Sequence, residues 1–275
     1  MQLLISFVLA FLPSIIWLML FLREDVHPEP NKNIIRVFLA GMLVTIPTIA
    51  VEALASCIIR NIGCPTDAAL ANTFAILQIP FEALGEHSKE LFFIFVGIAL
   101  IEELMKYFAV RFSILHRRTF NEPIDAILYM VIAALGFAAV ENALLVSGGE
   151  IQAATLLGAG GVVDVLGARA FSAVLLHALT SGIIGFGLAR SFFSRHTHII
   201  FLGASILIAA LIHGVYNGIV GGIAFPGELA PTVASTVLLL IVTGIVLLGM
   251  IQYLRRLSMK TRWVNTGDAV AHELH

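Results

Sequence analysis

Apolar stretches of membrane-spanning length recur along the sequence and constrain its fold more than any other feature. A helix needs about 20 consecutive, mainly apolar residues to cross the hydrocarbon core of a bilayer. We expect seven such helices, at residues 3–22, 34–54, 91–112, 124–146, 169–189, 199–222 and 232–254. Only 12% of the 275 residues are charged, which is about half the usual share in soluble domains. The sequence therefore predicts an all-α, polytopic membrane helix bundle.

The chain reads as one transmembrane domain at residues 1–255, followed by a polar tail at 256–275 that we expect in the cytoplasm. No internal repeat is apparent. The first apolar stretch is long enough to span a membrane and lacks a basic segment before it. We therefore expect it to be retained as a helix and not cleaved as a signal peptide.

Basic residues mark one side of the predicted bundle. They follow the first, third, fifth and seventh apolar stretches, as Arg23, Lys32, Arg36, Arg111, Arg117, Arg118, Arg190, Arg195, Arg255, Arg256, Lys260 and Arg262. The opposite loops hold only Arg60, Lys89 and Arg169. Because cytoplasmic loops are enriched in Lys and Arg, we expect a multi-pass protein of the cell membrane, with its N-terminus outside and its C-terminus in the cytoplasm. The net charge of −2 gives no reason to expect nucleic acid as a partner.

The long loop at residues 56–90 contains both cysteines, Cys57 and Cys64. Two cysteines are too few for a disulfide scaffold or a cysteine-based zinc site. They can form one disulfide in an oxidising compartment or remain two unrelated thiols, and the sequence leaves both open.

Three charged residues, Glu102, Glu103 and Lys106, interrupt the third apolar stretch. A charged side chain near the bilayer centre costs about 2.5–3.5 kcal/mol on insertion scales. Lys106 lies three and four residues after the two carboxylates, so it can pair with either on a helix. A purely structural ion pair is one interpretation, but two carboxylates against one ammonium leave an unbalanced charge. We therefore expect further polar partners.

The following apolar stretches supply such partners: Glu141, His177, His213 and Asn217. Counted along the helices at 1.5 Å per residue, these groups and the acidic pair fall into one layer in the outer half of the bilayer. Ionisable residues inside a membrane usually serve function. We interpret Glu52 differently, because it lies near the outer end of its stretch and can reach the interface.

The predicted cluster fits hydrolysis by activated water. Two histidines and one carboxylate can hold a catalytic zinc, while a second carboxylate acts as general base. In a metal-free scheme, a buried carboxylate activates water and an imidazole and an amide stabilise the oxyanion. We assign as candidate zinc ligands Glu141, His177 and His213, and as candidate catalytic residues Glu102, Glu103, Lys106 and Asn217. Within the acidic pair we favour Glu103 as the base, with Glu102 supporting it and Lys106 orienting both.

The order of these motifs resembles the PrsW family of intramembrane proteases, which is related to the CAAX prenyl endopeptidases and the bacteriocin-immunity membrane proteases. The resemblance covers about residues 20–220. It rests on Glu102-Glu103-x-x-Lys106, Gly136-Phe137-x-x-x-Glu141-Asn142, His177, His213-x-x-x-Asn217 and the earlier Pro28-Glu29-Pro30. It implies endoproteolysis of a membrane-anchored protein, such as an anti-sigma factor, with Glu102, Glu103, Glu141, His177 and His213 in the active site. In the CAAX relatives, histidine stands where this chain has Glu141.

Two other functions fit intramembrane Glu, His and Lys residues. One is a proton- or ion-coupled transporter, because such residues also form relays. The absence of repeated halves and of paired broken helices in the sequence argues against it. The other is a non-catalytic scaffold for membrane partners.

Overall fold

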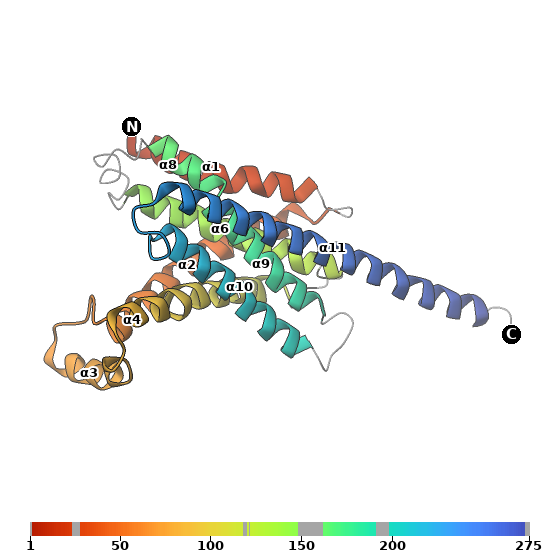
Figure 1. The fold of residues 1–275 in the computed structure, drawn as a ribbon. Coiled ribbons are helices and arrows are strands. Elements are labelled where there is room, and N and C mark those ends of the chain that lie inside the picture. Colours follow the sequence, from red (N-terminus) through yellow and green to blue (C-terminus); the bar gives the residue numbers. More distant parts are fainter. Residues whose placement is uncertain are drawn as a thin grey trace.

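The computed structural model describes residues 2–23, 28–117, 120, 122–147, 162–190 and 198–272, and within these ranges the chain is helical and has no strand. Figure 1 shows long helices packed side by side into a bundle, with the C-terminal helix projecting beyond the others. The predicted all-α, polytopic bundle is confirmed.

The elements follow the predicted apolar stretches closely. They are α1 (Gln2–Arg23), α2 (Asn31–Arg60), α3 (Ala68–Glu82), α4 (Glu86–Phe92), the π-helix η1 (Phe93–Leu100), α5 (Ile101–Ser113), α6 (Pro123–Ser147), α8 (Val162–Ala170), α9 (Ala173–Ala189), α10 (His198–Val220) and α11 (Leu229–His272). Five helical segments in the described ranges are long and apolar enough to span a membrane, at Asn31–Arg60, Pro123–Ser147, Asp164–Ala189, Ile199–Val220 and Leu229–Leu257. Val8–Arg23 is a shorter apolar helix, and the number seven remains a prediction.

The helix α6 and the α8–α9 segment form the interior of the bundle. In their most apolar windows, 83% and 78% of the residues are buried, against 22% for α2 and 39% for α10. Glycine allows the central helices to approach closely: a Cβ on Gly136 would lie 2.1 Å from the Phe38 carbonyl oxygen. The two interior helices carry Glu141 and His177, so the fold places these polar side chains among protein groups and not in lipid.

The third predicted span is irregular in the structure. It consists of α4, η1 and α5 in series, and the π-helical part ends immediately before the residues Ile101 and Glu102. Gly97 lies within η1, where a Cβ would come within 3.4 Å of the Ala55 side chain of α2. π-helical turns are rare and frequently occur at functional sites. This one directly precedes the acidic pair.

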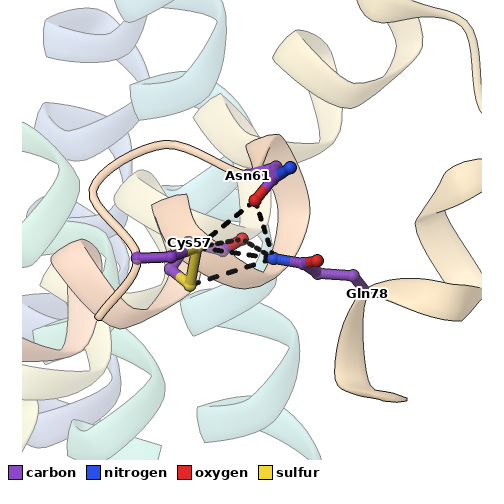
Figure 2. The surroundings of a disulfide bond; sticks show 4 residues. Cys57, Asn61 and Gln78 are labelled. Atoms are coloured by element: carbon purple, nitrogen blue, oxygen red, sulfur yellow. Dashed lines mark hydrogen bonds between the residues drawn. A yellow bond between two sulfur atoms is a disulfide. The ribbon is translucent and has the colours of Figure 1, made fainter. Parts of the chain in front are cut away.

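Cys57 and Cys64 form a disulfide at the end of α2. Figure 2 shows Gln78 of α3 reaching this turn, where its Nε2 donates to the Cys57 carbonyl oxygen at 3.0 Å and to Asn61 Oδ1 at 3.0 Å. The sequence left this pairing open. The disulfide and Gln78 together fasten α3 to the end of α2.

The opposite end of the bundle is fixed by Tyr129 of α6. Its hydroxyl donates to the carboxylate of Glu29, in the segment that precedes α2, and accepts from Asn33 Nδ2 at 3.3 Å. At the C-terminus, α11 continues beyond the predicted end of the seventh span at residue 254 and reaches His272. The segment expected as a polar tail is therefore helical as far as that residue.

Candidate active site

Lys106 of α5 lies at the centre of the polar cluster and is fully buried. Its Nζ is 3.1 Å from Glu102 Oε2, 2.9 Å from Glu103 Oε1 and 2.7 Å from His177 Nδ1. An ammonium group has three N–H donors, so these three acceptors satisfy it completely. The ring of Phe137 lies 4.7 Å from the same Nζ and adds a cation–π contact. The buried charge is thus fully compensated.

Glu103 is also fully buried, and its carboxylate accepts hydrogen bonds from four donors. Besides Lys106, these are His213 Nδ1 at 2.9 Å, Thr180 Oγ1 at 3.1 Å and Ser181 Oγ at 3.3 Å. The donors come from α5, α9 and α10. Glu103 therefore joins three helices, and its exposed area of zero leaves it without contact to water.

The two histidines have similar surroundings: each places one ring nitrogen near Glu102 and the other near a second carboxylate. His177 Nδ1 and His213 Nε2 lie 3.8 and 3.9 Å from Glu102 Oε2. The other ring nitrogen of each histidine faces a different carboxylate: His177 Nε2 lies 2.7 Å from Glu141 Oε2, and His213 Nδ1 contacts Glu103. A carboxylate behind the imidazole is the usual arrangement of a metal-binding histidine.

The buried group Glu102, His177 and His213 could hold a metal ion, because its three potential ligand atoms lie within 4.8 Å of one another. The Lys106 ammonium already contacts Glu102 Oε2 and His177 Nδ1, so a metal ion bound by these two atoms would have to displace it. This group of three residues differs in one member from the zinc ligands expected from the sequence, which were Glu141, His177 and His213. Glu102 belongs to the group, whereas Glu141 lies behind His177.

The predicted residues thus come from four helices, as expected. Glu102, Glu103 and Lys106 are on α5, Glu141 on α6, His177 on α9 and His213 on α10. Asn217 lies one helical turn after His213 and is partly buried. It therefore flanks the cluster on the α10 side.

Sequence reasoning missed Arg169 and the role of Asn142. Arg169 Nε donates to Asn142 Oδ1 at 2.6 Å, and Arg169 Nη2 lies 3.8 Å from Glu141 Oε2. Asn142 Nδ2 in turn donates to the Ala10 carbonyl oxygen of α1 at 3.4 Å. Arg169 was interpreted only as an outer-loop cation, but its side chain points back to α6. The position of Asn142 beside Glu141 was the one sequence signal for this contact.

Glu52 of α2 also belongs to the surroundings of the cluster and not simply to the interface. Its carboxylate interacts electrostatically with Glu102, Glu141 and Lys106. Its Oε1 is buried and has no hydrogen-bond partner among the described residues. The donor set of one carboxylate and two imidazoles suits a divalent cation.

Comparisons with known proteins point to one family. The sequence profile of the PrsW family intramembrane metalloproteases matches residues 29–250. The Protease PrsW of Geobacillus kaustophilus is 28% identical over 197 residues, which cover 72% of this chain and 71% of that protein. The Protease PrsW of Oceanobacillus iheyensis is 29% identical over 212 residues, covering 76% and 80%. That of Clostridioides difficile is 24% identical over 214 residues, covering 77% of each chain.

No solved structure matches this chain. The family match covers all four helices that supply the cluster. The chain therefore belongs to the PrsW family of intramembrane metalloproteases and is a membrane-embedded protease.

Proposed function

We propose that this protease hydrolyses a peptide bond in a single-span, membrane-anchored protein of the anti-sigma-factor kind. The observation that carries the proposal is the buried cluster around Lys106, in which Glu102 is faced by both His177 and His213. Such a cluster of ionisable groups is costly in a membrane protein unless a function requires it. The proposal places the protein in the cell membrane, with its N-terminus outside and its C-terminus in the cytoplasm.

Zinc is the proposed cofactor, held by Glu102, His177 and His213. These side chains provide the one carboxylate and two imidazoles of a typical catalytic zinc site. When bound there, zinc supplies Lewis-acid chemistry, which activates water and polarises the scissile carbonyl. Glu103 and Glu141 lie behind the two imidazoles and would fix their orientation.

In the metal-free scheme, Glu141 is the proposed general base. Its side chain is 29% exposed, against 7% for Glu102 and 0% for Glu103. A base must reach the water whose proton it removes, and Glu141 is the most exposed of these three carboxylates. This proposal revises the expectation for Glu103, which makes four hydrogen bonds and would position His213 and Lys106. Asn217, one turn after His213, is the proposed amide donor to the carbonyl oxygen of the scissile bond.

Metal removal tests the proposal directly. We expect purified protein in lipid vesicles to contain about one zinc per chain and to release the soluble domain from members of a library of single-span reporters. Chelation should abolish the release and added zinc should restore it. Cleavage by fully metal-free protein would contradict the zinc scheme. Proton-driven transport in the same vesicles without any cleavage would contradict the protease function and support a transporter.

Arg169→Ala should lower kcat by about 10- to 100-fold, as is typical for the loss of a residue behind a metal ligand or base. The reason is that Arg169 braces Glu141 through its contacts with Glu141 and Asn142. KM should change little, because Arg169 acts through Glu141 and not on the substrate. Steady-state kinetics on one reporter measures both constants.

Two further variants show whether a change in kcat comes specifically from the Arg169 contacts. Arg169→Lys should retain part of the activity, because an ammonium can still pair with Glu141 but does not reproduce the second contact. Arg111→Ala, which removes an exposed arginine from α5, is the matched control and should leave kcat unchanged. An unchanged kcat in Arg169→Ala would remove Arg169 from the positioning residues.

A further inference from the structure

The helix α3 is mainly apolar, although it lies in the loop that follows α2. Its 15 residues contain no charged side chain between Asp67 and Glu82. A helix of this length measures about 22 Å and is too short to cross a bilayer. Apolar segments of 10–14 residues are typical of buried core helices or of segments in the membrane interface.

α3 is not a core helix. Four of its large apolar side chains are strongly exposed, with 50% for Leu70, 67% for Ile76, 45% for Leu77 and 59% for Ile79. In Figure 1, α3 lies at the edge of the molecule, away from the long helices of the bundle. Exposed apolar surface of this kind is unfavourable in water and indicates a binding surface.

The shape of the exposed surface favours lipid over a protein partner. At 100° per residue, the four exposed side chains spread over about half of the helix circumference. A helix that packs against another protein element buries a narrower stripe, whereas lipid chains cover any exposed face. Gln78, the residue that binds the end of α2, lies on the remaining side.

The apolar surface of α3 also continues a surface that already faces lipid. The span α2 exposes Ile46 at 67%, Ile49 at 43% and Leu54 at 44%, and Ile62, at 52% exposure, follows at the turn. The Cys57–Cys64 disulfide and Gln78 hold α3 beside this end of α2. The tether therefore keeps α3 at the level where α2 leaves the membrane.

We propose that α3 lies in the membrane interface, with Leu70, Ile76, Leu77 and Ile79 among the acyl chains of the leaflet in which α2 ends. The charged residues Asp67 and Glu82 at its two ends remain at headgroup level, as in other interfacial helices. The disulfide then lies at the membrane surface and not in an extended outer domain. This inference goes beyond the proposed function and does not depend on it.

Photocrosslinking tests the inference in the full chain. Benzoylphenylalanine replaces Ile79, or Leu77 in a second variant, and the protein is reconstituted in vesicles of phosphatidylethanolamine and phosphatidylglycerol with alkyne-tagged acyl chains. Ile46 is the positive control, because it faces lipid from a span. Thr66, an exposed residue of the polar loop before α3, is the negative control.

We expect lipid labelling at Ile79 and Leu77 to approach that at Ile46 and to exceed that at Thr66 by at least about fivefold, as for a helix whose apolar face is buried in the acyl boundary. Labelling at both positions no higher than at Thr66 would overturn the inference. Crosslinks at these positions to a second protein chain in place of lipid would equally overturn it. Both outcomes can be read whether or not the protein cleaves a reporter, so they are separate from the test of the protease.

Discussion

The substitution Glu102→Gln should reduce kcat/KM for reporter cleavage by about 10⁴-fold, the upper end of what one positioned acid–base group contributes. Glutamine has nearly the same size as glutamate but lacks the negative charge that faces Lys106 and both imidazoles. Glu102 is central in either hydrolytic scheme, as a zinc ligand or as the carboxylate that holds Lys106 between the two histidines. Cleavage should therefore be lost whichever scheme operates.

The metal content of the same variant separates the two schemes. If Glu102 is a ligand, bound zinc should fall together with activity, whereas a metal-free mechanism predicts lost activity with no metal in either protein. Glu86→Gln is the matched control, because it makes the same chemical change at a side chain that is 87% exposed. It should preserve both activity and zinc. Wild-type cleavage by Glu102→Gln would remove Glu102 from the active site.

Lys106→Met should destabilise the protein by about 3–5 kcal/mol, the usual cost of removing one partner from a buried ion pair. The side chain of Lys106 is fully buried and its three acceptors belong to α5 and α9. Without the ammonium, Glu102 and Glu103 remain buried side by side with no cation between them. Denaturant titration in detergent micelles measures the free energy of unfolding.

A compensating variant tests the electrostatic cause of this loss. Glu103→Gln added to Lys106→Met removes one of the uncompensated carboxylates and should recover part of the stability. Cleavage should stay low, because His213 then lacks its carboxylate partner and Glu102 lacks its cation. Equal stability of Lys106→Met and the wild-type protein would show that the ammonium does not hold α5 and α9 together.

The sequence was sufficient to predict the bundle and the members of its polar cluster. Long apolar stretches can satisfy their backbone groups in lipid only as helices or closed barrels, so helical spans followed from their length and composition. The cluster followed from depth, since Glu102, Glu141, His177 and His213 fall into one layer when residues are counted along successive helices. Both arguments use the position of a residue along its helix axis. The sequence determines this position well, because each residue adds a fixed rise.

The sequence did not predict how each helix is rotated about its own axis, nor the paths of the loops. The different surroundings of Glu102 and Glu103 depend on the angle at which each side chain approaches α9 and α10. Arg169 turns back to Asn142 because α8 descends beside α1 before α9 begins, which no local pattern indicates. The Cys57–Cys64 pairing needs the chain to reverse after α2. Asn61 and Gly63 provide this reversal with φ angles of 57° and 75°.

The π-helical segment Phe93–Leu100 sets the direction in which Glu102 and Glu103 point around the helix axis. A π-helix uses i→i+5 hydrogen bonds in place of i→i+4, so every side chain after it is rotated relative to the course of an uninterrupted α-helix. Glu102 and Glu103 would therefore point elsewhere in a regular helix of the same composition and length. Lys106 would still pair with them, because it lies within the same regular helix, but the approach to the histidines of α9 and α10 would be lost. The segment acts as an angular offset, which turns both carboxylates together towards the histidines of α9 and α10.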